Sequence, residues 1–234
     1  MLKLEHCIIK NNEFTLRAEF GIDAGTKTAV IGPSGAGKST LLEAIAGFRD
    51  FAEGRVFWKD QDLTELAPGK RPVSMLFQDG NLFPHLTAAE NIALGLQPNK
   101  RLSDAERAQV QSALGRVGLS EMAARKPSEL SGGQQSRVAL ARVLVQKRDL
   151  LLLDEPFAAL GPALKAEMLD LVADLVAETG TTLLMVSHDP EDARRIAEQV
   201  VLVADQVAAQ PVPTSSLFEN PPVALRDYLV QSHP

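Results

Sequence analysis

The sequence predicts an α/β fold in which buried strands are followed by helices. Three observations support this prediction. The glycine-rich stretch 32–40 joins an apolar run to residues with helical spacing. Two further short, wholly apolar runs, 150–153 and 182–186, are typical of strands covered on both faces. Ser103 and Ser131 are each followed three residues later by Glu or Gln, which is a helix start signal.

Composition sets the limits for function. The chain has 234 residues, of which 45% are hydrophobic, enough for a sizeable core in one large domain or two small ones. The net charge of −6 argues against a protein that binds nucleic acid through a broad basic face. Residues 1–10 lack the apolar run of a secretory signal, and we expect no membrane span. The single cysteine, Cys7, is expected to be a buried apolar residue.

The first third of the chain is expected to be rich in strands before and after the glycine-rich stretch 32–40. The helix after that stretch should end near Gly47. Alternating or apolar runs predict strands at 2–4, 14–20, 29–31, 55–59 and 73–77.

The rest of the chain is expected to be a mostly helical insert followed by strands that alternate with helices. The insert, 79–130, includes a helix from Ser103 to about residue 117. Helices are also predicted after Ser131, from about 162 to 177, up to 196, and near 225–229. Strands are predicted at 150–153, 182–186, 200–203 and 206–208. No internal repeat is present, so we expect one nucleotide-binding unit.

The stretch 32–40 matches the phosphate-binding pattern G-x-x-x-x-G-K-[ST] in full. Its glycines allow backbone N–H groups to converge on a polyphosphate at the start of a helix. Lys38 would reach the terminal phosphates, and the Ser39 hydroxyl would bind Mg²⁺. A chance match is the alternative, but the preceding strand and following helix argue against it. The predicted ATP ligands are Gly32, Pro33, Ser34, Gly35, Ala36, Gly37, Lys38, Ser39 and Thr40.

An acidic pair ends the apolar run 150–153. A nucleotide site of this kind needs a carboxylate at the end of a buried strand to hold the magnesium shell, and Asp154 is the candidate. Glu155 could orient or deprotonate the water that attacks the γ-phosphate. The alternative is an acidic pair on a solvated sheet edge. The phosphate-binding loop upstream favours the catalytic interpretation.

The segment 130–134, Leu-Ser-Gly-Gly-Gln, resembles the signature of the ATP-binding cassette (ABC) family, and the resemblance covers essentially the whole chain. The family's other landmarks follow in its order: the phosphate-binding loop, Gln78, the acidic pair and His188. The resemblance implies a P-loop NTPase (RecA-like) core with an N-terminal antiparallel β subdomain and an inserted helical subdomain. It therefore predicts one ABC ATPase domain, 1–234, with a core of 1–78 and 131–234 and a helical subdomain of 79–130.

The resemblance also implies roles for the site residues and a homodimer. Gln78 would contact Mg²⁺ or the attacking water, and His188 would contact the γ-phosphate and position Glu155. The implied cofactors are ATP and Mg²⁺, with Ser39, Gln78 and Asp154 around the metal. The signature residues would bind the γ-phosphate of ATP held by the opposite subunit, so two chains would close head to tail. The residues expected to act in trans are Ser131, Gly132, Gly133 and Gln134.

Three positions depart from the family pattern. Gly161 stands where an aspartate usually braces the dimer interface, so we expect hydrolysis with altered cooperativity. Asn11 stands where an aromatic residue usually stacks on adenine. Phe14 could substitute, although its alternation with neighbouring apolar residues favours burial in the core. Gln135 and Ser136 replace Arg-Gln, which is a mild change.

Within the family, segments 71–78, 81–87 and 183–188 are most similar to the ATP-binding subunits of bacterial thiamine importers. The tail is also too short for the regulatory domain of several other importer ATPases. This resemblance implies import of thiamine and thiamine phosphates with an integral membrane permease, a periplasmic solute-binding protein and no nucleic acid. It places the chain on the cytoplasmic face of the inner membrane as a peripheral subunit.

The apolar cluster of Leu82, Phe83, Pro84 and Leu86 has two interpretations. It is either part of the insert's own core or a groove for a cytoplasmic helix of the permease. Alternatives for the whole chain are the ATPase of another small-solute importer, a soluble non-transport ABC ATPase, and a hydrolysis-impaired ATP-binding module suggested by Gly161.

Overall fold

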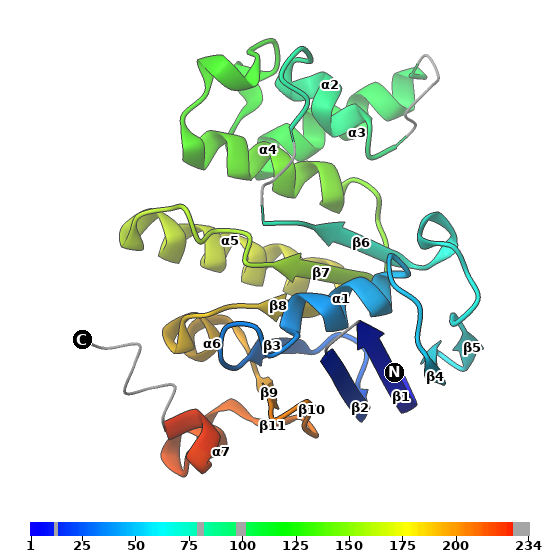
Figure 1. Cartoon of the computed structure of the whole chain (residues 1–234). Helices are drawn as coiled ribbons and strands as arrows, with labels where there is room; N and C mark the ends of the chain where they lie inside the picture. Colours follow the sequence, from blue (N-terminus) through cyan, green and yellow to red (C-terminus); the bar gives the residue numbers. More distant parts are fainter. Residues whose placement is uncertain (12–13, 79–81, 97–101, 227–234) are drawn as a thin grey trace.

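The computed structural model describes residues 1–11, 14–78, 82–96 and 102–226. Its strands form one curled mixed sheet in the order β5-β4-β1-β2-β10-β9-β3-β8-β7-β6, with β11 paired to β9. Helices lie on both faces of the parallel part of this sheet, and a separate helical layer lies above β6 and β7 (Figure 1). The predicted α/β class is therefore confirmed.

The amino-terminal part is an antiparallel sheet of β1 (Leu2–Asn11), β2 (Phe14–Ile22), β4 (Glu53–Trp58) and β5 (Gln61–Asp62). The expectation of a short strand at 2–4 is wrong, because β1 pairs on both sides along most of its length. A register shift between Leu4 and Cys7, with His6 at φ 48°, moves the buried positions from even to odd numbers. This bulge interrupts the alternation that would have revealed one long strand.

The second part of the sheet is parallel and holds the predicted buried strands. They are β3 (Lys27–Ile31), β6 (Val73–Leu76), β7 (Leu150–Asp154), β8 (Thr182–Val186) and β9 (Gln199–Ala204). Two short strands, β10 (Val207–Ala208) and β11 (Val212–Pro213), pair antiparallel with β9, and β10 also joins β2. The predicted closing pair of strands is confirmed.

Alternate residues of the central strands pack against different helices, as the two-residue strand period requires. Leu150 and Leu152 lie in one core cluster with α1 (Lys38–Ala46). Leu151 and Leu153 lie in a second cluster, on the other face, with α4 (Gly132–Leu144) and α5 (Pro162–Thr179). α1 and α4 therefore lie on opposite faces of the sheet. α1 ends at Gly47, as predicted, and this residue adopts the left-handed conformation common at helix ends.

The helical layer consists of α2 (Ala88–Ala93), α3 (Asp104–Arg116) and α4, which share a third core cluster. The capping boxes predicted at Ser103 and Ser131 are confirmed, and Thr87 starts α2 with another. α4 packs on the sheet as well as on α2 and α3. Assignment of residues 79–130 to a separate helical subdomain is therefore a proposal. Short 3-10 turns cover Pro68–Lys70, Ser120–Met122 and Pro127–Glu129.

The carboxyl-terminal part returns to the sheet. α6 (Pro190–Ile196) ends where predicted, and α7 (Thr214–Glu219) is a helix that the sequence did not reveal. Residues 223–226 are helical, and the remainder of the helix expected near 225–229 lies outside the described residues. No helix in the described part of the chain is both long and apolar enough to cross a bilayer.

Candidate nucleotide-binding site

The register of the parallel strands brings the predicted site residues to one sheet edge. Leu76 lies opposite Leu153, Asp154 lies opposite Val186, and Val186 lies opposite Val30. The loops that follow these four strands therefore emerge together at their carboxyl ends, where open α/β sheets bind ligands. Those loops carry the glycine-rich stretch, Gln78, the acidic pair and His188.

The loop 32–37 leads into α1, and two of its glycines, Gly32 and Gly37, hold positions where any side chain would cause strain. Gly37 is the N-cap of α1 at φ 100°, and no side chain caps this helix. A Cβ on Gly37 would lie 2.4 Å from the Phe14 ring, and one on Gly32 would lie 2.0 Å from the Val203 carbonyl oxygen. The uncapped amino terminus leaves backbone N–H groups available to an anion.

Lys38 lies in the first turn of α1, and its side chain folds back over the loop. Its Nζ donates to the carbonyl oxygens of Gly32 at 2.8 Å and Pro33 at 2.9 Å, and the residue is only 6% exposed. Burial lowers the pKa of Lys38, while Glu155 and Asp154 act in the opposite direction. A cation held here by two neutral carbonyls, with carboxylates nearby, can attract a phosphate group.

Ser39 and Asp154 form the second feature of the edge. The Ser39 hydroxyl donates to Asp154 Oδ1 at 2.9 Å, and burial raises the pKa of Asp154. Within the described residues, no three His, Cys, Asp or Glu side chains gather into a metal centre of their own. One hydroxyl and one carboxylate fit Mg²⁺, which binds nucleotide enzymes through one or two carboxylates plus phosphates and water.

Glu155 and His188 meet across the ends of β7 and β8. His188 Nδ1 lies 3.1 Å from Glu155 Oε2, and His188 is the more exposed of the two. Glu155 has φ 45°, an uncommon left-handed conformation for a non-glycine residue, and its N–H donates to the Val186 carbonyl. Such strained residues cluster at active sites and switch regions. The pair can position and deprotonate a water molecule.

A charged network formed by residues adjacent to His188 and by Lys165 of α5 was not predicted from the sequence. Lys165 Nζ lies 2.6 Å from Asp189 Oδ2 and 2.8 Å from Asp192 Oδ1. The Ser187 hydroxyl donates to Asp192 at 2.5 Å. The network joins the first turn of α5 to the loop and helix that carry His188, so it restrains that side chain's position. Its partners are up to 27 residues apart in sequence, which hides the contact from pattern reading.

Gln78 and the signature segment lie apart from these contacts. Gln78 is exposed just after β6, at the same sheet edge as Glu155. Ser131 caps α4, and its side-chain hydroxyl accepts from the Gln134 N–H at 3.3 Å. α4 lies on the opposite face from α1, and no hydrogen bond or ion pair joins residues 131–134 to the loop 32–40 in the described parts of the chain.

The departures from the family pattern have clear local structures. Gly161 is the N-cap of α5 in an extended conformation, and a Cβ there would meet nothing within 4 Å. Phe14 is half-buried, and its ring lies against Gly37, so it borders the phosphate-binding loop as well as the core. The side chain of Asn11 lies outside the described residues.

Arg71 is a supporting residue that the sequence did not reveal. It is 3% exposed, and its guanidinium donates to the carbonyls of Ala44 and Ile45 in the last turn of α1. It also donates to the carbonyls of Leu66 and Thr64. Burial lowers the pKa of Arg71. The helix that begins with Lys38 and Ser39 is thus anchored at its other end by an arginine.

The cluster 82–86 divides between core and surface. Leu82 packs against two core clusters, whereas Phe83 is 47% exposed. Buried Asn91 fixes this loop by accepting from the Phe83 N–H and donating to the Phe83, Leu86 and Thr87 carbonyls. A rigid loop therefore presents an exposed aromatic ring close after Gln78.

The chain is similar in sequence to a known family and to named proteins. The family model described as "ABC transporter" matches residues 16–158. A protein named "Thiamine import ATP-binding protein ThiQ" from Ruegeria sp. (strain TM1040) is 63% identical over 98% of this chain and 99% of its own length. The protein of the same name from Cereibacter sphaeroides is 60% identical over the same shares.

Two solved structures also resemble the chain. The dimeric structure of a bacterial ABC transporter cassette has a TM-score of 0.79 and 30% identity over 92% of this chain and 99% of its own. A dimeric post-hydrolysis state of an ATP-binding cassette, bound to ADP and Pi, has a TM-score of 0.78 and 29% identity over the same shares.

Proposed function

The chain belongs to the ABC transporter family, and from this membership we propose that it is the ATP-hydrolysing subunit of a bacterial thiamine importer. The observation that carries the proposal is identity of 60–63% over nearly the whole chain to two proteins named as thiamine import ATP-binding proteins. The cargo would be thiamine and thiamine phosphates. The second candidate is the ATPase of another small-solute importer built on the same cassette.

ATP would lie along the loop 32–40, with its phosphates at the amino terminus of α1. The uncapped helix end and the Lys38 ammonium supply positive potential where the phosphates would lie. Ser39 and Asp154 would hold Mg²⁺, which supplies charge neutralisation on the β- and γ-phosphates when it is bound. Phe14, whose ring lies against Gly37, would contact the nucleotide in place of the usual aromatic residue near residue 11.

Glu155 would accept a proton from the attacking water while His188 keeps the carboxylate oriented. Their 3.1 Å contact supports this assignment, as does the strained backbone of Glu155. The Lys165 network would hold His188 in place from behind. Gln78, at the same edge, would sense the occupied site and report to the helical layer.

The signature residues Ser131, Gly132, Gly133 and Gln134 would complete the site of a second chain. Their place at the start of α4, on the opposite face from α1, supports action in trans. Two similar cassettes were solved as dimers, which supports the pairing of two chains. ATP binding would then close two chains, and hydrolysis would let them separate.

A membrane permease would convert this closure into transport. We propose that the permease contacts Phe83, because the loop held by Asn91 presents that exposed ring five residues after Gln78 in the sequence. The chain would work as a peripheral subunit on the cytoplasmic face of the membrane, and a periplasmic solute-binding protein would deliver the cargo to the permease. Phe83→Asp should reduce transport and leave ATP binding unchanged; full transport in this variant would contradict the placement.

The test is ATP hydrolysis by the chain reconstituted in vesicles with its permease and solute-binding protein. Thiamine-loaded binding protein should stimulate hydrolysis several-fold. Glu155→Gln should bind ATP normally but lose hydrolysis by a factor of about 10² or more, as removal of a general base does. Stimulation only by another solute would overturn the thiamine assignment. Wild-type hydrolysis no faster than that of Glu155→Gln would overturn the enzymatic one.

A further inference from the structure

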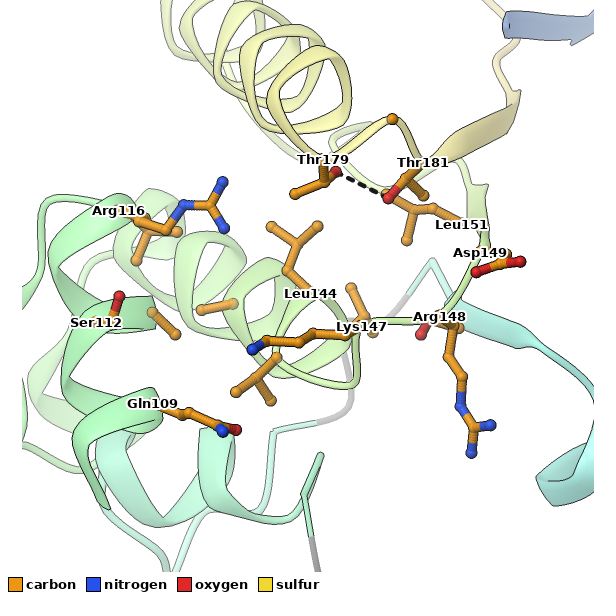
Figure 2. Close-up of a pocket in the computed structure, with 17 residues that line it drawn as sticks. Gln109, Ser112, Arg116, Leu144, Lys147, Arg148, Asp149, Leu151, Thr179 and Thr181 are labelled. Atoms are coloured by element: carbon orange, nitrogen blue, oxygen red, sulfur yellow. Dashed lines mark hydrogen bonds between the residues drawn. The ribbon is translucent and has the colours of Figure 1, made fainter. Parts of the chain in front are cut away.

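A cavity of about 380 Å³ lies between the helical layer and the sheet, away from the nucleotide edge. It is lined by α3, the end of α4, the loop before β7 and the turn after α5 (Figure 2). The loop before β7 lies at the amino end of that strand, whereas Asp154 lies at its carboxyl end. The cavity and the nucleotide site therefore lie at opposite edges of the sheet.

Two cationic side chains enter this cavity from different elements. Figure 2 shows Lys147, in the loop before β7, reaching across toward Gln109 of α3, and Arg116 extending inward from α3. Leu144 and Leu151 line the cavity as apolar walls. The cavity thus combines apolar walls with a few polar groups, as small-molecule sites do.

The charge in the cavity is positive. Lys147 has no carboxylate within 4.0 Å in the described parts of the chain, whereas Arg116 pairs with Glu178 through Nη2 at 2.6 Å. A guanidinium carries five N–H donors, so this pair leaves others available. The one acidic residue that lines the cavity is Asp149, and Trp58 and Lys59 already donate to its carboxylate at 2.9 and 2.8 Å.

The backbone of Lys147 provides a second observation. It has φ 52°, an uncommon left-handed conformation for a lysine, at the turn between α4 and β7. Side chains held in such conformations cluster at ligand clamps and active sites. Arg148, which follows it, also lines the cavity, but its guanidinium points away from Lys147 and Arg116 (Figure 2). The turn therefore directs the charge of only one of these two neighbouring cations inward.

We propose that this cavity binds a small organic phosphate. The phosphate would lie between Lys147 and Arg116, because both side chains form strong charge-assisted hydrogen bonds with such oxyanions. A compact apolar ring would pack on Leu144 and Leu151. The cavity volume of about 380 Å³ lies within the usual range for small-molecule sites, roughly 300–1,000 Å³. A bound ligand would join α3 to the loop before β7, and so join the helical layer to the sheet.

Phenyl phosphate is a suitable probe, and its binding to the full chain can be measured by calorimetry. The protein is first saturated with ADP so that the loop 32–40 is filled. We expect saturable binding that weakens about tenfold or more in Lys147→Asn, since asparagine tolerates the left-handed conformation but carries no charge. Arg148→Asn is the matched control, because it removes an adjacent charge that points away from Lys147 and Arg116, and it should bind normally.

Three outcomes would overturn the proposal. They are no saturable binding of phenyl phosphate, equal affinity for the wild type and Lys147→Asn, or equal weakening in Lys147→Asn and Arg148→Asn. Inorganic phosphate and benzoate separate the two parts of the ligand. Phosphate binding as tightly as phenyl phosphate would refute the apolar subsite, and tighter binding of benzoate would refute the phosphate head group. None of these measurements depends on ATP hydrolysis or transport.

Discussion

Replacing Arg71 should destabilise the protein severely, although the residue lies outside every nucleotide motif. Its side chain is almost fully buried and donates to four carbonyl oxygens. Two of these, on Ala44 and Ile45, lie in the last turn of α1, where carbonyls lack the usual helical partners. The Ala44 carbonyl also accepts from the Gly47 N–H at 3.2 Å. Arg71 thus closes the carboxyl end of the helix whose amino end forms the phosphate-binding loop.

The magnitude follows from those four contacts. Arg71→Met keeps most of the volume but removes every donor that Arg71 supplies. Each buried carbonyl left unpaired costs about 1–3 kcal/mol, whereas the Ala44 carbonyl keeps its hydrogen bond from Gly47. The two hydrogen bonds to α1 are fully buried, and the other two are partly exposed. Burial of the charged Arg71 guanidinium is itself unfavourable, as its lowered pKa indicates. Removal of this buried charge offsets part of the cost. We expect a loss of about 3 kcal/mol, a large share of the 5–15 kcal/mol typical of a domain.

Urea denaturation measures this loss. Arg71→Lys should be destabilised to a similar extent, because an ammonium has three donors and cannot reproduce the planar fork. Arg55→Met is the control: its side chain is 70% exposed and 3.8 Å from Asp62, so its effect should stay within about 0.5 kcal/mol. A loss below about 1 kcal/mol in Arg71→Met, or wild-type stability in Arg71→Lys, would refute the reasoning. ADP affinity measured on the same variants shows whether the anchor also positions the loop 32–40.

Three further predictions concern the interface position, the cysteine and acid stability. Gly161→Asp should raise the free energy of unfolding by a few tenths of a kcal/mol, because it adds a helix cap in open space. The wild type should already hydrolyse ATP without this substitution. Hydrolysis restored only by Gly161→Asp would contradict that view. Burial raises the pKa of Cys7 to about 11, so iodoacetamide at pH 8 should label it only after unfolding, and rapid labelling of native protein would be the contrary result. Hydrogen bonds from Lys59 and Trp58 lower the pKa of Asp149, so its stabilisation is complete above pH 3.8 and is lost as the pH falls further. The urea midpoint, followed by the fluorescence of Trp58, the single tryptophan, should therefore fall less on acidification in Asp149→Asn than in the wild type.

The sequence predicted features that depend on neighbouring residues. The loop 32–40 carries its own strand and helix, so its motif specified the local structure before any tertiary contact was known. Ser103 and Ser131 could be identified as caps because both partners lie within four residues. The trans role proposed for residues 131–134 rests on a motif resemblance, and the structure adds that α4 lies across the sheet from α1.

The missed features depend on partners that are distant in sequence. Lys165 meets Asp189 only because α5 and α6 pack together, and Arg71 meets Ala44 because β6 begins under the end of α1. Without those contacts a lysine or arginine is expected at the surface. Motifs therefore locate the groups that we propose contact the nucleotide, whereas the residues that hold these groups in place are determined by packing. A loss of function at Arg71 or Lys165 should consequently be accompanied by a loss of stability or of His188 positioning, and not by loss of a nucleotide contact.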